Sequence, residues 1–122
     1  MLNNKESFSR NIKRRVLIAE DEYINRVLLE NILKDDFDVI LASDGEEALD
    51  LMKDRRPSVV LLDLQMPKLS GMELLRIMGQ DEELSHIPVL VQTSSQEHKD
   101  EIECLKLGDV DFVSKPYNPE VL

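Results

Sequence analysis

The stretch VVLLDLQMP, residues 59–67, joins a short apolar run to a single carboxylate. Four consecutive Val and Leu residues are typical of a strand that is buried on both faces. Asp63 follows the run directly, and Pro67 lies four positions further on. A charged group at the end of a buried strand is costly unless another group pairs with it. The residues that follow the other strands therefore decide whether Asp63 is an ordinary turn residue or part of a site.

The composition is that of one acidic globular domain. Of the 122 residues 42% are apolar, and 25 Asp and Glu outnumber 15 Lys and Arg, so the formal net charge is −10. This charge argues against direct binding to nucleic acid or to an anionic membrane surface. The single cysteine, Cys104, allows neither an internal disulfide nor a thiolate zinc cluster, and it fits a cytoplasmic location. No apolar stretch approaches the ~20 residues of a membrane-spanning helix.

Apolar runs and amphipathic segments alternate along the chain. Residues 1–14 are polar and are predicted to form a flexible leader, and residues 15–122 form the domain. Strands are predicted at 15–19, 37–43, 58–63, 87–94 and 110–114, and helices at 22–36, 44–55, 70–79 and 97–108, with one more beginning at 118. In the first helix the apolar residues at helical spacing are Ile24, Val27, Leu28 and Ile32. Asp44 is the predicted N-cap of the second helix.

Alternating strands and helices, with strands that are apolar on both faces, predict an α/β fold. The expected architecture is a doubly wound five-stranded parallel sheet with helices on both faces. Right-handed crossovers bring the carboxyl ends of all strands to one edge of such a sheet. Ligands bind outside that edge, at the topological switch point. We therefore expect the functional residues among those that follow the strands.

Chemically active side chains follow four of the five predicted strands. They are Glu20, Asp21 and Glu22 after the first, Asp63 after the third, Thr93, Ser94 and Ser95 after the fourth, and Lys115 after the fifth. Taken singly, each has an ordinary explanation as a helix cap, a turn residue or a surface lysine. Together, clustered carboxylates call for a cation, and hard oxygen ligands suit Mg²⁺. A carboxylate beside Mg²⁺, a hydroxyl and a lysine can attack phosphorus, so Asp63 is the candidate phosphoacceptor.

Four motif blocks in this order resemble the receiver domain of bacterial two-component response regulators. They are VLIAEDE (16–22), VVLLDLQMPKLSGMELL (59–75), IPVLVQTS (87–94) and GDVDFVSKPY (108–117). The resemblance extends from residue 16 to residue 122 and implies a flavodoxin-like fold with strand order 2-1-3-4-5. It implies that Asp63 accepts a phosphoryl group from the phosphohistidine of a sensor histidine kinase or a phosphotransfer protein.

The resemblance also implies how the metal is held. Asp21 and Asp63 would bind Mg²⁺ directly, together with the backbone carbonyl of Gln65. Glu20 would act largely through water.

The same resemblance implies a switch around the phosphoryl group. Lys115 would pair with that group, and Thr93 would move inward to bond one of its oxygens. Phe112 lies where the family has an aromatic residue that turns inward as the threonine moves.

Partners are likewise expected from the resemblance. The chain ends at Leu122, one turn into the predicted fifth helix, so we expect this helix to be truncated and an output domain or effector protein to lie beyond it. A homodimer through the face formed by the fourth helix, fifth strand and fifth helix is a further expected arrangement. An incomplete fifth helix would leave one face of the sheet uncovered. We also expect the chain to self-associate, or to pack on another chain, through that face.

Other functions fit the sequence less well. An aspartyl-phosphate phosphatase of the haloacid dehalogenase type needs a second aspartate where this chain has Gln65, and neither G-x-G-x-x-G nor G-x-x-x-x-G-K-[ST] is present. The alternative that stays open is a degenerate receiver that acts as a phosphorylation-independent interaction scaffold. The joint presence of the acids, Thr93 and Lys115 argues against it. The expected function is thus a phosphoacceptor that assists its own phosphorylation and dephosphorylation, and not an enzyme.

Overall fold

The computed structural model describes residues 13–92, 99, 102 and 110–113. Its strands are β1 (Arg14–Ala19), β2 (Phe37–Ala42), β3 (Val59–Asp63), β4 (Val89–Gln92) and β5 (Val110–Val113). Its helices are α2 (Tyr23–Leu33), α3 (Gly45–Arg55) and α4 (Gly71–Gln80), followed by the short 3-10 helix η1 (Leu84–His86). Of the predicted helix 97–108 the described residues are Lys99 and Ile102, which are both helical. The predicted helix from Asn118 and the leader up to residue 12 lie outside the described residues.

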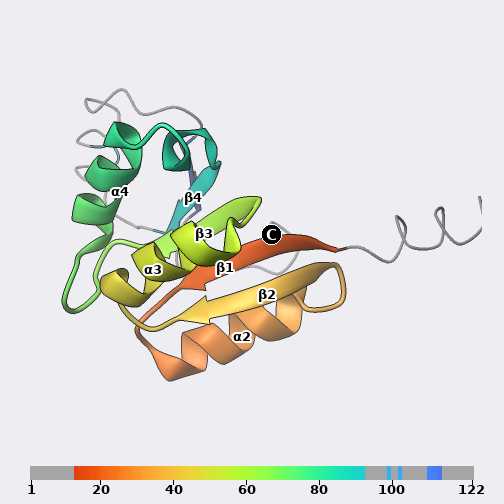
Figure 1. Cartoon of the computed structure of the whole chain (residues 1–122). Coiled ribbons are helices and arrows are strands. Elements are labelled where there is room, and N and C mark those ends of the chain that lie inside the picture. Colours follow the sequence, from red (N-terminus) through yellow and green to blue (C-terminus); the bar gives the residue numbers. More distant parts are fainter. Residues whose placement is uncertain (1–12, 93–98, 100–101, 103–109, 114–122) are drawn as a thin grey trace, which may run out of the picture.

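The five strands form one parallel sheet in the order β2-β1-β3-β4-β5. The chain passes from β1 to β2 on one side and then returns across β1 to β3 on the other (Figure 1). The topological switch point therefore lies between the carboxyl ends of β1 and β3. The predicted flavodoxin-like sheet and its strand order 2-1-3-4-5 are confirmed.

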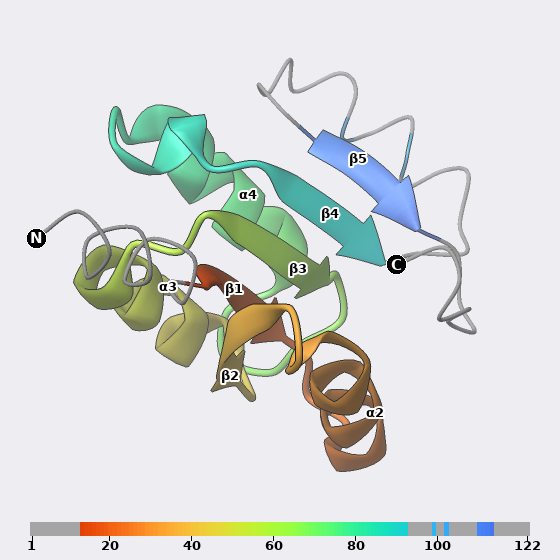
Figure 2. The ribbon, with the colours of Figure 1, turned by 90° about the vertical axis from the view of Figure 1, so that its right-hand side faces the viewer.

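Helices cover both faces of the sheet. Figure 2 shows α2 on one face and α3 and α4 on the other. On the α3 and α4 face, Leu17, Val60 and Val91 pack with apolar residues of those helices. On the α2 face, Ile18 and Leu61 pack with leucines of α2. Both faces of the central strands are thus buried, as their continuous apolar sequence predicts.

The face of α2 that packs on the sheet differs from the predicted one. The buried residues are Leu29 and Leu33, whereas Ile24 is 78% exposed and Leu28 is 42% exposed. The predicted helix is present, and Ile32 of its predicted apolar residues packs against the core, whereas Ile24 and Leu28 do not. The helix carries more apolar residues than one face can hold, so helical spacing alone does not decide which of them point to the sheet.

The helix starts follow the local sequence closely. The side chain of Asp44 accepts a hydrogen bond from the backbone N–H of Glu47, which confirms Asp44 as the N-cap of α3. The side chain of Ser70 accepts one from the N–H of Glu73 at the start of α4. Within the described part of the chain, no helix is both long enough and apolar enough to cross a bilayer.

Candidate functional site

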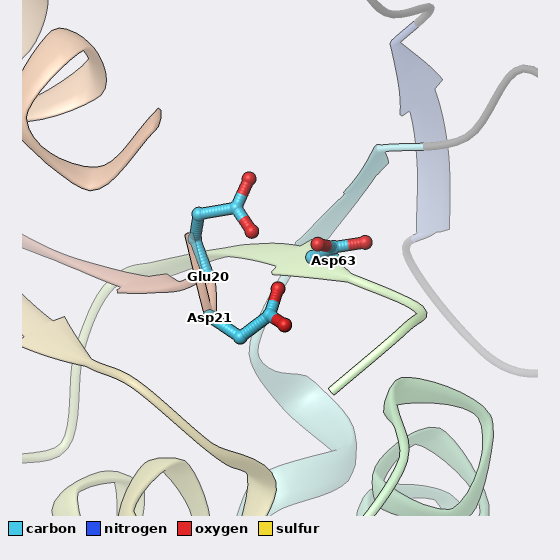
Figure 3. A group of neighbouring side chains, drawn as sticks. All are labelled: Glu20, Asp21 and Asp63. Atoms are coloured by element: carbon cyan, nitrogen blue, oxygen red, sulfur yellow. The ribbon is translucent and has the colours of Figure 1, made fainter. Parts of the chain in front are cut away.

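Three carboxylates meet at the switch point. Glu20 and Asp21 follow β1, and Asp63 is the last residue of β3, the strand next to β1. One carboxylate oxygen from each residue lies within 4.8 Å of the other two (Figure 3). Glu20 is fully buried and Asp63 is 4% exposed, while Asp21 is exposed to solvent. The sheet edge thus places two buried acids and one solvent-facing acid around a common point.

Backbone hydrogen bonds fix these acids where the strands end. The N–H of Glu20 donates to the carbonyl of Ala42 at 3.0 Å, which extends the β1–β2 ladder by one residue. The N–H of Glu22 donates to Oε2 of Glu20 at 3.4 Å, and the N–H of Gln65 donates to Oδ1 of Asp63 at 3.1 Å. The buried acids are therefore oriented by the turns that follow their own strands.

Arg26 holds the turn that carries Glu20 and Asp21. One of its guanidinium nitrogens donates to the carbonyl of Glu20 at 2.8 Å and to the carbonyl of Asp21 at 2.9 Å. The guanidinium also lies 5.8 Å from the ring centroid of Tyr23. Arg26 was not among the predicted site residues. Its signal was a cation in the first turn of a helix, where the helix dipole disfavours positive charge.

The loop from β3 to α4 is packed closely against the end of β3. The N–H of Gly71 donates to the carbonyl of Leu64 at 2.9 Å, and a Cβ at residue 71 would lie 2.5 Å from the carbonyl oxygen of Asp63. Only a residue without a side chain fits here without displacing the strand end. The loop therefore sets the position of Asp63 through contacts between backbones.

The same loop also contacts the start of α3. Lys68, which has a positive φ of 68°, brings Nζ to 3.6 Å from Oδ2 of Asp44. The pKa of Asp44 is lowered, first by the N–H of Glu47 and then by the charge of Lys68, while partial desolvation opposes the shift. The N-cap of α3 thus stays ionised and helps to hold the loop.

The donor set fits a hard divalent cation. Three carboxylates gathered within 4.8 Å repel one another, and a cation with oxygen ligands relieves that repulsion. Mg²⁺ takes one or two protein carboxylates and keeps several waters, so one exposed acid beside two buried ones leaves room for those waters. The predicted ligands Glu20, Asp21 and Asp63 are therefore brought together as expected. The N–H of Gln65 donates a hydrogen bond to Asp63. Binding of a metal ion by the carbonyl of Gln65 stays a prediction.

The other predicted site residues are described only in part. Thr93 and Lys115 lie outside the described residues, so their roles stay predictions. Phe112 lies in β5 beside Val91 of β4, is half-buried and packs against the core on the α4 face. The ammonium of Lys99 lies 5.8 Å from the centroid of its ring. The role of Phe112 as a switch residue stays a prediction.

Comparison with known proteins places this site in a family context. The family model described as the response regulator receiver domain matches residues 16–122. The alkaline phosphatase synthesis transcriptional regulatory protein PhoP of Bacillus subtilis is 35% identical over 88% of this chain, which spans 45% of that protein's length. The polar-differentiation response regulator DivK of Brucella anthropi is 35% identical over 83% of this chain and 83% of its own length.

A solved structure agrees in fold. The receiver domain of the sensor histidine kinase PA1611 from Pseudomonas aeruginosa PAO1 superposes with a TM-score of 0.79 at 25% identity, covering 90% of this chain and 91% of that one. That structure holds a magnesium ion coordinated in its active-site cleft.

Proposed function

The chain belongs to the response regulator receiver domain family, and we propose that Asp63 is its phosphoacceptor, charged by a sensor histidine kinase or a phosphotransfer protein. The observation that carries the proposal is the convergence of Glu20, Asp21 and Asp63 within 4.8 Å at the switch point. An acid at the end of an apolar strand, flanked by two further acids, has little structural purpose in a metal-free protein. It has a direct purpose in phosphoryl transfer, where charge must be balanced at phosphorus.

The residues of this chain divide the work of the reaction. A carboxylate oxygen of Asp63 attacks phosphorus, the bond from phosphorus to the donor imidazole nitrogen breaks, and an acyl phosphate forms. The N–H of Gln65, bonded to Oδ1, orients the carboxylate for this attack. Mg²⁺ held by Glu20, Asp21 and Asp63 would supply positive charge to the transferring phosphoryl oxygens. Lys115 and Thr93 are proposed to bind the phosphoryl group on its remaining sides.

Output control is part of the same proposal. The chain spans less than half the length of the PhoP relative, whose name describes a transcriptional regulator. We propose that the phosphorylated domain acts on an output domain or a separate effector, through a change that Thr93 and Phe112 transmit. In this role the protein takes part in its own phosphorylation and dephosphorylation as a switch and does not turn over a substrate.

Labelling with acetyl phosphate, a small phosphoryl donor, tests the chemistry without a kinase. The wild-type chain should gain one phosphoryl group in the presence of Mg²⁺ and none after chelation. Asp63→Asn should abolish the labelling, because an amide oxygen is a poor nucleophile. Asp50→Asn, which changes an exposed carboxylate of α3, is the matched control and should label normally. Undiminished labelling of Asp63→Asn would exclude Asp63, and an unlabelled wild type would favour the scaffold alternative.

A further inference from the structure

The side chain of Gln92 is buried without a hydrogen bond. It ends β4, it is 1% exposed, and neither Nε2 nor Oε1 has a partner among the residues that the structure describes. Folding removes this amide from water, and no described residue gives it a hydrogen bond in return, which is unfavourable. Native proteins satisfy most buried polar groups, and an exception calls for an explanation such as a ligand. Gln92 is therefore a candidate for binding something that the free protein lacks.

The register of the sheet places Gln92 beside the phosphoacceptor. The β3–β4 ladder pairs Asp63 with Gln92, and it pairs Leu61 with Leu90 two residues earlier. Both leucines belong to the core on the α2 face. Because side chains alternate along a strand, Asp63 and Gln92 leave the sheet on that same face. They are same-face neighbours at a strand spacing of about 4.8 Å.

Glu20 completes a row of polar side chains across three strands. Glu20 lies directly after β1, two positions after Ile18, which belongs to the α2 face. The strand β1 is the other neighbour of β3. The carboxyl edge therefore carries Glu20, Asp63 and Gln92 side by side on the α2 face, and Figure 2 shows β1, β3 and β4 ending together. The first two contribute to the metal cluster. The third brings a neutral hydrogen-bond donor to the opposite side of Asp63 from Glu20.

We propose that the Gln92 amide is a ligand of the phosphoryl group on Asp63, to which its Nε2 donates a hydrogen bond. This inference rests on the proposed function of Asp63. A phosphoryl group brings three strong acceptor oxygens, whereas in the free protein Oδ1 of Asp63 already accepts the N–H of Gln65. The amide is then unsatisfied before phosphorylation and satisfied after it. Its burial destabilises only the free state, so Gln92 shifts the balance toward the phosphorylated state.

Binding of beryllofluoride, which mimics the phosphoryl group on a carboxylate, tests the role. Gln92→Met keeps the length of the side chain and removes its polar atoms. We expect the unfolding temperature of the free protein to rise and the affinity for beryllofluoride with Mg²⁺ to fall about tenfold, the effect of one hydrogen bond to a charged group. Calorimetry measures both the unfolding temperature and the affinity. Tryptophan fluorescence cannot be used, because the chain has no Trp. Gln80→Met, at an exposed position of α4, is the control and should change neither.

The wild-type protein offers a second measurement that needs no variant. The side-chain amide resonance of Gln92 should shift on addition of beryllofluoride, and its exchange with water should slow. Unchanged Gln92 resonances, or a folded Gln92→Met protein that binds beryllofluoride as tightly as wild type, would overturn the assignment and leave the role of Asp63 intact. Failure of the wild type to bind beryllofluoride would instead overturn the proposed function, and this inference with it.

Discussion

The guanidinium of Arg26 ties the acidic turn after β1 to the first turn of α2. Its two hydrogen bonds end on the backbone carbonyls of Glu20 and Asp21, so the cation holds the backbone of the turn that carries these acids. Hydrogen bonds from a charged donor to backbone carbonyls are among the stronger contacts in a protein.

Arg26→Gln should therefore lower the free energy of unfolding by about 1–3 kcal/mol. The substitution removes both hydrogen bonds and also a positive charge beside the acidic turn. Urea unfolding followed by circular dichroism measures the change. Lys53→Gln, which removes an exposed cation of α3, is the control and should stay within about 0.5 kcal/mol of wild type. Equal stability of the two variants would show that Arg26 does not hold the turn.

The acidic residues of the site were predictable from the sequence, whereas the residues that contact or neighbour them were not. Glu20, Asp21 and Asp63 were predicted because each directly follows an apolar run, and the structure brings them together. Arg26 and Gln92 were missed because their importance depends on backbone carbonyls and on burial. Neither quantity is visible in the order of residues.

Among the described helices, α4 begins directly against the strand end that carries Asp63. At Gly71 the first turn of the helix lies against the backbone of Asp63 and Leu64, with no space for a side chain. Ser70 caps the helix one residue earlier, so the cap and the contact are adjacent. The helix start is therefore packed directly on the strand end.

Gly71→Ala should destabilise the protein by about 1–3 kcal/mol, even though alanine favours a helix by up to about 1 kcal/mol over glycine. The new Cβ would meet backbone atoms, which cannot rotate away as a flexible side chain can. Gly79→Ala, at an exposed position of the same helix, is the control and should stabilise by up to about 1 kcal/mol.

Urea unfolding separates the two alanine variants, and acetyl phosphate labelling reports on Asp63. Gly71→Ala should label more slowly than Gly79→Ala, because the new Cβ would displace the carbonyl oxygen of Asp63, the phosphoacceptor itself. If Gly71→Ala is as stable as Gly79→Ala and labels as fast, the close contact does not position Asp63.

Element types were predictable, and the orientation of α2 was not. Alternating strands and helices determine a parallel sheet, because each helix must return the chain to the same starting edge. The face that α2 buries depends on competition among apolar residues that surround most of the helix, and Leu29 and Leu33 occupy the core instead of Ile24 and Leu28. The short helix η1 also carried no signal in the sequence pattern.

For the molecule as a whole, negative charge is the dominant electrostatic feature. The chain carries a formal charge of −10, and three of its acids are concentrated at one edge of the sheet. Self-repulsion of this kind destabilises the folded state when no cation is bound. The proposed roles of Thr93 and Lys115 stay predictions, because both residues lie outside the described part of the chain.

Millimolar Mg²⁺ should raise the melting temperature of the whole domain. Binding only to the folded state stabilises it by about 1.4 kcal/mol at ten times Kd. Asp21→Asn should remove most of this rise, whereas Asp50→Asn should retain it. Calorimetry at constant ionic strength, with NaCl replacing MgCl₂ in the reference, separates specific binding from screening. A melting curve that is indifferent to Mg²⁺ would contradict the metal site.

The position of the acids on β1 and β3 links the site to the order in which the chain folds. Both strands, and β2 on the other side of β1, lie within the first 63 residues, so their pairings close shorter loops than a contact between β1 and the end of the chain would. The pairing of β1 with β3 is enough to bring the carboxylates together, and it does not depend on β4 or β5. The clustered acids therefore belong to the part of the sheet whose strand pairings close the shorter loops. A change that weakens the pairing of β1 with β3 therefore disturbs the centre of the sheet and its charge cluster in one step.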